Sequence, residues 1–497
     1  MDHVGADQLS LVELLQCFGP KLEQFIKPAE DDPIVRAATA KEVCDAFDDL
    51  TLVEEPISKE QLTRDLSSIL SYSVRTSHPH FYDKLYGGTS PVGCFSELLI
   101  SALNANVHTF QAAPVMTVLE QSCIQQLNAI VGFPESAEGL FCPGGAYSNM
   151  LAMYTALRHA KRQLDERETP LTKPPRLVIL TSSAAHYSVV SSATLMGIPD
   201  QDVIRLPSDL YGRLQPTALQ EYLVRVVDGS VDENFTVIPF FLSCTAGTTV
   251  TGAFDRFEEI ATVLESHKDV WFHIDGCWGG SVILSEKHRH LMNGCQHAHS
   301  LAWNPHKMMH LPLQCSVLLV RPPGCLNGVT GKPAAYLFHA KSSLGEDISL
   351  KTLQCGRKGD GLKLWLCWRV LGRQGFVALI DENFALAQYF HERLLSHPHV
   401  LVLEKQPQCL NICFWYIPPS LRGHVCTVED LQKHKTAVSH CTTTIVQRLR
   451  EEGTALSDVA PMGDFPYFLR VVLHHPQLGK QGLDRFLDHV ERVARDL

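Results

Sequence analysis

The sequence predicts an α/β protein with a large, mainly parallel sheet and a smaller α+β domain towards the C-terminal end. Three observations indicate this class. Short, continuous apolar runs bounded by polar residues are typical of strands that are buried on both faces. Helical segments separate these runs, and this alternation produces parallel pairing. The chain also has 497 residues, too many for one average core, so two or three domains are expected.

The first part, residues 1–95, is predicted to be helical, because residues 9–15 and 59–74 repeat apolar side chains at about i, i+3 and i+4. The second part, residues 96–374, is predicted to hold the large sheet. Its strands are predicted at 176–183, 236–243, 270–275 and 315–321, with a helix at 257–267 between two of them. Residues 322–357 form a long functional loop on this prediction.

The third part, residues 375–497, is predicted to be the smaller α+β domain. Helical segments lie at both of its ends, and the strand-like runs 410–417 and 467–473 lie between them. No internal repeat or low-complexity tract interrupts any of the three parts.

Composition and charge exclude several classes of function. A net charge of −11 argues against nucleic acid or an anionic membrane as the main partner. The first residues carry neither a basic region nor an apolar core, and no run of about eighteen apolar residues is present, so we expect a cytoplasmic protein without a membrane span. The 16 cysteines form no CxxC pair, and we expect buried, reduced thiols.

Paired histidines raise the question of a metal site. Such pairs occur at 78 and 80, 288 and 290, 297 and 299, and 397 and 399. None is joined by a cysteine or a carboxylate at ligand spacing. We therefore expect no metal site.

One carboxylate and one lysine carry the clearest chemical signal. The apolar run from Val270 delivers Asp275 to the end of a predicted buried strand, and the segment Trp303-Asn-Pro-His-Lys ends at Lys307. A lysine that binds the aldehyde and a carboxylate that pairs with the pyridine nitrogen are the two partners that pyridoxal phosphate needs. The pair therefore predicts a pyridoxal-phosphate enzyme.

With these motifs the sequence resembles the group II pyridoxal-phosphate-dependent amino-acid decarboxylases, from about residue 66 to 497. The segments 354–357, 362–366 and 411–422 are most similar to the branch that acts on cysteine sulfinate, other acidic amino acids and glutamate. The resemblance implies fold type I, like aspartate aminotransferase, with a large sheet of the seven-stranded type. It also implies a homodimer, with residues 1–95 packing at the interface.

The glycine-rich segment that opens at Cys142 precedes an amphipathic helix, and the N-terminus of a helix favours a phosphate. A turn without a ligand is the alternative. The resemblance assigns His186 to stacking on the cofactor ring, opposite Cys277, where the family usually has alanine. The resemblance assigns the remaining cofactor contacts to Gly145, Ala146, Thr249, Ser300, Asn304 and His306.

Substrate contacts are expected at four positions. Arg470 lies within an apolar strand, and the family places an arginine of this motif against the substrate α-carboxylate. Lys84 stands where relatives usually have glutamine, and it would favour an acidic side chain unless it is only a solvated surface residue. Tyr86 and His108 occupy positions that tune substrate choice in the family.

The loop 339–347 departs from the family pattern, because it has no tyrosine where relatives keep the one that returns a proton to Cα. His339, Lys341 or solvent could take that role. We therefore predict a decarboxylase of a small acidic L-amino acid such as cysteine sulfinate, aspartate or glutamate. One alternative is decarboxylation coupled to oxidative deamination, or another step of a specialised pathway. Another is an inactive homologue that retains the fold.

Overall fold

The computed structural model describes residues 10–328, 348–475 and 477–497, and the chain divides into two compact units. One unit is Ser90–Glu382. The other joins the residues up to Thr89 to Asn383–Leu497, so the N-terminal helical part groups with the C-terminal part. The sequence had suggested three parts with boundaries near these positions, and it gave no sign of this grouping.

The unit Ser90–Glu382 contains a seven-stranded sheet in the order β1-β7-β6-β5-β4-β2-β3. Its described strands are β1 (Glu138–Cys142), β2 (Pro175–Ser182), β3 (Val203–Leu206), β4 (Thr236–Thr245), β5 (Trp271–Gly276), β6 (Ser300–Trp303) and β7 (Ser316–Val320). The neighbours from β6 to β3 are parallel, whereas β7 pairs antiparallel with both β1 and β6. The predicted α/β class with a mainly parallel sheet is confirmed.

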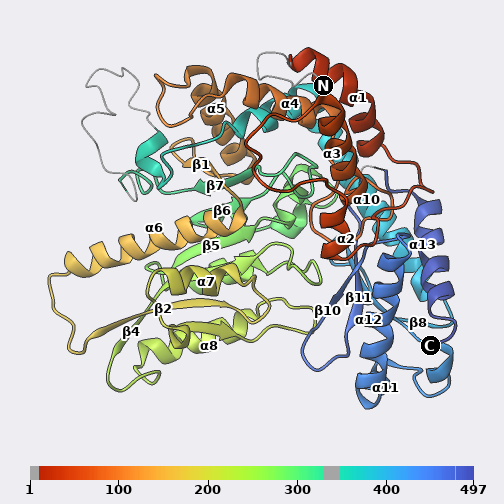
Figure 1. The fold of residues 1–497 in the computed structure, drawn as a ribbon. Helices are drawn as coiled ribbons and strands as arrows, with labels where there is room; N and C mark the ends of the chain where they lie inside the picture. The colour runs from red at the N-terminus through yellow and green to blue at the C-terminus, as the bar shows by residue number, and fades with distance from the viewer. Residues whose placement is uncertain (1–9, 329–347, 476) are drawn as a thin grey trace. The chain divides into compact units, whose positions relative to one another are not determined.

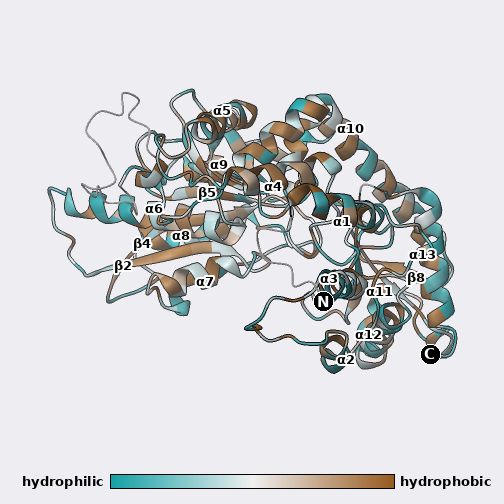
Figure 2. Cartoon of the chain, turned by 45° about the horizontal axis from the view of Figure 1, so that its top comes forward, coloured by the Kyte–Doolittle hydropathy of each residue, from teal (hydrophilic) through white to brown (hydrophobic). Residues whose placement is uncertain are grey.

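This unit also contains helices. They are α4 (Pro91–Leu103), α5 (Pro114–Val131), α6 (Gly145–Asp165), α7 (Ser188–Leu195), α8 (Pro216–Val227), α9 (Phe257–Leu264) and the first part of α10 (Gly361–Leu395). Short 3-10 helices lie at Asp200–Asp202, Gly279–Leu284, Arg289–Met292, Cys295–His297 and Ile348–Lys351. The long helix α6 packs against β1, β4, β5, β6 and β7 (Figure 1). Figure 2 shows β2 in the colour of apolar residues, as expected for a strand within this core.

The parallel strands bring the chemically interesting residues to one edge of the sheet. In the strand register Thr245 of β4 pairs with Asp275 of β5, which pairs with Ala302 of β6. Lys307 follows the end of β6, and His186 follows the end of β2. In open α/β sheets ligands bind outside the carboxyl ends of the strands, so this edge is where a site is expected.

The other unit contains a four-stranded antiparallel sheet in the order β10-β11-β9-β8. Its strands are β8 (Val400–Val402), β9 (Asn411–Tyr416), β10 (Asp458–Ala460) and β11 (Phe468–Val472). Its helices are α1 (Leu11–Ile26), α2 (Ala40–Asp45), α3 (Lys59–Tyr72), α11 (Val428–Lys433), α12 (Lys435–Glu451) and α13 (Lys480–Val493), with a 3-10 helix at Pro419–Leu421. Helix α3 begins at residue 59 because the Ser58 hydroxyl accepts the N–H of Gln61.

The N-terminal segment is joined to this smaller sheet by backbone hydrogen bonds. Tyr82 donates to the carbonyl of Leu456 at 2.7 Å, and Val472 donates to the carbonyl of Tyr82 at 3.1 Å. The side chains of Ile34, Phe81 and Leu456 form a small buried cluster at this seam. The segment around Lys84 is thereby held beside the strands β10 and β11.

Candidate active site

The turn before α6 leaves little room for side chains. Gly144 has a φ of 105°, and α6 begins at the next residue. A Cβ on Gly145 would lie 2.5 Å from Cys277 Sγ and 2.8 Å from Asn304 Nδ2. Three segments that are distant in the sequence therefore converge at the N-terminus of a helix, where backbone N–H groups favour an anion. This narrow turn fits the phosphate of the predicted cofactor.

Asp275 ends β5 as a buried carboxylate. Its Oδ2 accepts a hydrogen bond from Asn149 Nδ2 at 2.8 Å, and its Oδ1 accepts one from the backbone N–H of Cys277 at 3.1 Å. Burial disfavours the charged form, but hydrogen bonding with Cys277 and the charges of His186 and Lys307 outweigh it and hold the pKa of Asp275 below its usual value. A buried carboxylate that stays ionised is the partner that a pyridine nitrogen needs.

Lys307 lies in the turn after β6, where its backbone N–H bonds to the carbonyl of Asn304 at 3.0 Å. Its side chain is half-buried, and no hydrogen bond or ion pair from its ammonium is found within the described residues. It lies close enough to Asp275 for its charge to lower the pKa of that carboxyl. The geometry thus leaves an amine free to react with a carbonyl group.

His186 lies near the same two residues. Burial lowers the pKa of its imidazole, the Asp275 carboxylate raises it and Lys307 lowers it, so the ring is neutral near pH 7. Its Nδ1 accepts the backbone N–H of Ser188 at 3.2 Å and lies 2.8 Å from Ser188 Oγ. A neutral planar ring at this position suits the predicted stacking role.

Three predicted phosphate or lysine neighbours have defined partners. The hydroxyl of Ser300 lies 2.8 Å from both His273 Nδ1 and Trp271 Nε1, and the residue is 0% exposed. Asn304 Oδ1 accepts the hydroxyl of Ser316 at 2.6 Å, which leaves its Nδ2 facing Gly145. His306 Nδ1 lies 2.6 Å from the carbonyl of Cys315, and burial lowers its pKa to about 4. The Ser300 hydroxyl, at the start of β6, therefore bonds to two side chains of β5, and its expected contact with the phosphate stays a prediction.

The turn that carries Thr249 requires glycine at its start. Gly247 has a φ of 82°, and a Cβ there would lie 2.7 Å from Cδ1 of Trp278. Thr249 itself is half-buried. The predicted cofactor contact at Thr249 thus lies on a turn that packs against the residues following Cys277.

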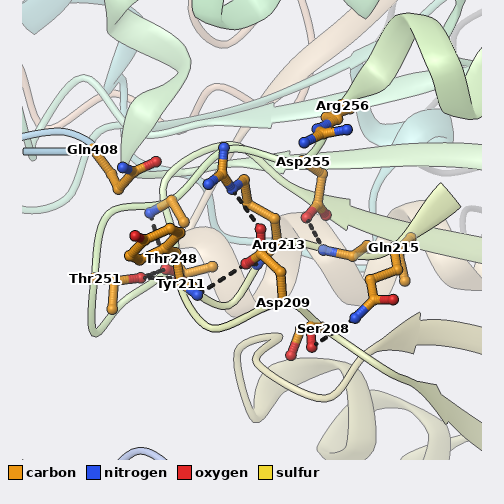
Figure 3. A network of polar contacts seen from close by, with 12 residues as sticks. Ser208, Asp209, Tyr211, Arg213, Gln215, Thr248, Thr251, Asp255, Arg256 and Gln408 are labelled. Carbon is orange, nitrogen blue, oxygen red and sulfur yellow. Dashed lines mark hydrogen bonds and ion pairs between the residues drawn. The ribbon is translucent and has the colours of Figure 1, made fainter. Parts of the chain in front are cut away.

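A polar network holds this turn in place (Figure 3). Asp255 accepts the N–H of Thr245 at 2.7 Å and that of Leu214 at 2.6 Å, and burial raises its pKa to about 7. The hydroxyls of Thr248 and Thr251 lie 2.8 Å apart. The segment near residue 214 and the turn after β4 are therefore fixed to one carboxyl group.

Two of the predicted substrate residues belong to one charged cluster in the other unit. Arg470 on β11 is buried, and its Nη2 donates to Asp458 Oδ2 at 2.9 Å and to the carbonyl of Asp83 at 2.6 Å. Lys84 Nζ lies 2.8 Å from Asp83 Oδ1 and 3.5 Å from Asp458 Oδ2. Its side chain is 46% exposed. The cluster therefore contains two cations and two carboxylates.

Tyr86 and His108 lie apart from these bonds. The ring of Tyr86 packs against Phe81, with 6.1 Å between the centroids. His108 is buried in the segment between α4 and α5, in the unit Ser90–Glu382. Their predicted influence on substrate choice stays a prediction.

Sequence reasoning missed four polar residues, Asn149, His273, Asp83 and Asp458. Two signals were present. Asn149 lies on the apolar face of the helix after the glycine turn, and His273 interrupts an apolar strand, and buried polar groups in such positions require partners. Asp83 and Asp458 gave no signal, because their significance depends on the strand pairing that brings them to Arg470.

No group of three histidine, cysteine or carboxylate side chains within 10–328, 348–475 and 477–497 is arranged to hold a metal ion. No helix in these ranges is long and apolar enough to cross a membrane. The loop 339–347, with His339, Lys341 and the missing tyrosine, lies outside the described residues.

Comparisons with known proteins identify the family of this chain. Residues 43–417 match the model of the pyridoxal-dependent decarboxylase conserved domain. The chain is 36% identical to cysteine sulfinic acid decarboxylase of Mus musculus over 481 residues, which is 94% of each protein. The human protein of that name is also 36% identical, over 90% of this chain and 89% of its own length. The crystal structure of mouse CSAD superposes with a TM-score of 0.88 at 33% identity, over 98% of this chain and 99% of that one.

Proposed function

This chain belongs to the pyridoxal-dependent decarboxylase family and is a carboxy-lyase that uses pyridoxal 5'-phosphate, and we propose that its substrate is a small acidic L-amino acid such as cysteine sulfinate, aspartate or glutamate. The observation that carries the substrate proposal is the position of Arg470 and Lys84, which both lie within reach of the carboxylate of Asp458. Two cations in one cluster suit a substrate with two acidic groups. The relatives named for cysteine sulfinic acid support the same class.

The residues around Lys307 have separate roles in this proposal. Lys307 would hold the cofactor through its amine, and the turn at Gly145 would hold the phosphate. Asp275 would keep a proton on the pyridine nitrogen, because its own charge is maintained by hydrogen bonds. Bound pyridoxal phosphate supplies a ring that accepts the electron pair released when carbon dioxide leaves Cα. His186 would orient the ring, so that the bond to the carboxylate is the one that breaks.

The charged cluster would receive the substrate by exchange of partners. Arg470 is paired with Asp458 in the structure, and Lys84 with Asp83. A substrate carboxylate can replace Asp458 at the guanidinium, because both present the same oxygen atoms to a planar donor. Lys84 would then meet the second acidic group of the substrate. The buried arginine is never left without an anion on this route.

Proton return to Cα decides the product. An amine results if an acid of the chain or a water molecule protonates Cα, whereas oxidation by dissolved O2 gives aldehyde and ammonia, with hydrogen peroxide as the reduced product. Because the segment 339–347 lacks the family tyrosine, we propose slow turnover with some aldehyde beside the amine. A variant with tyrosine at Leu344 would shift the ratio towards the amine.

The experiment is a product analysis with cysteine sulfinate, cysteate, aspartate and glutamate. Release of carbon dioxide from at least one acidic amino acid supports the proposal. Release only from neutral or aromatic amino acids would contradict the substrate class. Borohydride reduction of the loaded enzyme, followed by peptide mapping, should label the peptide that contains Lys307. A label on a different lysine would contradict the role given to Lys307.

We also propose that two copies associate and that the protein acts in the cytoplasm. Large apolar side chains are exposed on two helices of the unit Ser90–Glu382, namely Phe95 on α4 and Val115 and Val118 on α5, of which Val115 is 69% exposed. A second copy would remove them from water. Sedimentation should therefore show a dimer, and Val115→Asp should weaken it. A monomer at micromolar concentration would contradict this proposal.

A further inference from the structure

A continuous chain of hydrogen bonds connects buried polar residues behind Asp275. Trp271 Nε1 donates to Ser300 Oγ at 2.8 Å, and Ser300 Oγ lies 2.8 Å from His273 Nδ1. His273 Nε2 lies 3.0 Å from Asn149 Oδ1, and Asn149 Nδ2 donates to Asp275 Oδ2 at 2.8 Å. All five residues are buried, so water does not compete for these bonds.

The charge of Asp275 determines the direction of every bond in this chain. A carboxylate only accepts hydrogen bonds, so the NH₂ group of Asn149 faces it and the Asn149 oxygen faces His273. His273 must then donate from Nε2. Burial lowers its pKa to about 4, so the ring is neutral and its Nδ1 accepts the hydroxyl of Ser300. The Ser300 oxygen in turn accepts the N–H of Trp271, and no donor or acceptor is left in conflict.

A second branch leads from Asn149 to His186. The second N–H of the Asn149 amide donates to Ser188 Oγ at 3.1 Å. The hydroxyl of Ser188 can then donate to Nδ1 of His186, 2.8 Å away, and the backbone N–H of Ser188 also points to that nitrogen. Because Nδ1 accepts both bonds, the single proton of the neutral imidazole is on Nε2. One amide group thus contacts Asp275 directly and reaches His186 through Ser188.

We propose that Asn149 is a positioning residue that couples Asp275 to His186: its amide holds the Asp275 carboxylate ionised and oriented, and through Ser188 it fixes the tautomer of His186. In this proposal the Asn149 amide is kept in one orientation by the bonded series His273, Ser300 and Trp271. A flipped amide would direct its oxygen at the carboxylate of Asp275. Residues behind a ligand often determine its orientation and basicity in this way. The inference depends on the cofactor, which the family establishes, and not on the proposed substrate.

The test uses the enzyme loaded with pyridoxal phosphate labelled with ¹⁵N at the pyridine nitrogen. In the wild-type protein the ¹⁵N signal should be that of a protonated nitrogen. Asn149→Leu removes both N–H donors, and Asn149→Asp places a second carboxyl beside Asp275, so that the two cannot both be ionised. Both changes should move the signal towards the unprotonated value. The dissociation constant of pyridoxal phosphate should rise by about tenfold to a hundredfold, the range for a hydrogen bond to a charged group.

Two further variants separate positioning from simple packing. His273→Gln keeps an N–H donor for the Asn149 oxygen and should retain the ¹⁵N signal, whereas His273→Leu should shift it. Asn128→Leu is the matched control, because Asn128 is also buried in this unit and its amide donates to the carbonyl of Glu138 at 3.4 Å. It should lower the thermal midpoint of the apoprotein and leave the ¹⁵N signal unchanged.

The outcomes are distinct. If the Asn149 variants keep a protonated nitrogen and wild-type affinity for pyridoxal phosphate, the inference is overturned, even when the thermal midpoint falls. If Asn149→Leu does not fold, Asn149→Ser and His273→Leu decide by the same two readouts. A wild-type protein that binds no pyridoxal phosphate would overturn both this inference and the function proposed above. A normal wild-type signal with unresponsive variants would overturn this inference alone.

Discussion

Replacing Arg357 by methionine should destabilise the unit Ser90–Glu382 and weaken cofactor binding. Arg357 is buried, and its Nη2 lies 2.7 Å from Oε1 of the buried Glu120. Its Nη1 donates to the carbonyl of Val107 at 2.7 Å, and its Nη2 donates to that of Phe141 at 2.9 Å. Glu120 also accepts the N–H of Phe141 at 3.0 Å. This ion pair therefore fixes the end of β1, directly before the turn that leads to Gly145.

The magnitude follows from the burial of both charges. Removing one partner of a buried ion pair costs about 3–5 kcal/mol, because the other charge is left in an apolar site. For a unit of this size each kcal/mol shifts the thermal midpoint by about 2–4 °C, so Arg357→Met should lower it by about 6–20 °C. Arg357→Met combined with Glu120→Leu removes both charges, and it should be more stable than Arg357→Met alone.

Thermal unfolding of the apoprotein and equilibrium binding of pyridoxal phosphate measure the two effects. Arg162→Met is the matched control, since Arg162 pairs with Glu166 at 3.4 Å on the surface with both side chains well exposed. Its cost should stay below about 1 kcal/mol. An Arg357→Met variant that unfolds within about 2 °C of the wild type, or a double variant that is no more stable than Arg357→Met alone, would contradict this prediction.

Three further predictions concern the sites. Gly145→Ala should weaken the binding of pyridoxal phosphate, measured by absorbance titration, because the new Cβ would lie 2.5 Å from Cys277 Sγ. Adding Cys277→Ala should restore part of the affinity, whereas the control Gly356→Ala should have no effect, because a Cβ there meets no atom within 4 Å. Lys84→Gln should change the ratio of kcat/KM between cysteine sulfinate and glutamate by about tenfold or less, because the lysine side chain is partly exposed. An unchanged ratio would show that Lys84 is only a solvated surface residue. Burial lowers the pKa of His273 from 6.5 to about 4, so as the pH falls the unfolded chain binds this proton before the folded protein does, and stability is lost. Urea unfolding should show that His273 contributes a loss of about 2 kcal/mol in the free energy of unfolding between pH 7 and pH 5, and that His273→Gln lacks this loss. The same dependence of unfolding free energy on pH in both proteins would contradict the prediction.

The sheet of the larger unit could be predicted in part from local pattern. The strands β2, β4, β5 and β7 lie within about two residues of their predicted bounds, because continuous apolar runs indicate strands buried on both faces. No separate apolar run predicted β3, which has only four residues. The antiparallel direction of β7 and the pairing of residues near 81 with Leu456 depend on contacts that are distant in the sequence, and no local pattern contains them.

The candidate site, too, could be predicted only in part from the sequence. Asp275 and Lys307 could be singled out because a charged residue next to a buried strand needs a chemical reason. The hydrogen bonds of Asn149 and Ser300 could not be predicted, since they depend on which donor faces which acceptor, and only the folded geometry supplies that. Asp458 became relevant only when the register of β10 and β11 placed it opposite Arg470.

The discontinuous unit has a consequence for synthesis on the ribosome. The segment that ends at Thr89 emerges from the ribosome before Ser90–Glu382, whereas Leu456, its pairing partner in the smaller sheet, emerges after that unit. At roughly 5–20 residues per second, the nascent chain carries Ile34 and Phe81 without their partner for roughly 20 to 80 seconds. The whole of Ser90–Glu382 can collapse during that interval. We therefore expect the early segment to need a chaperone, or transient contacts of its own, until Leu456 has emerged.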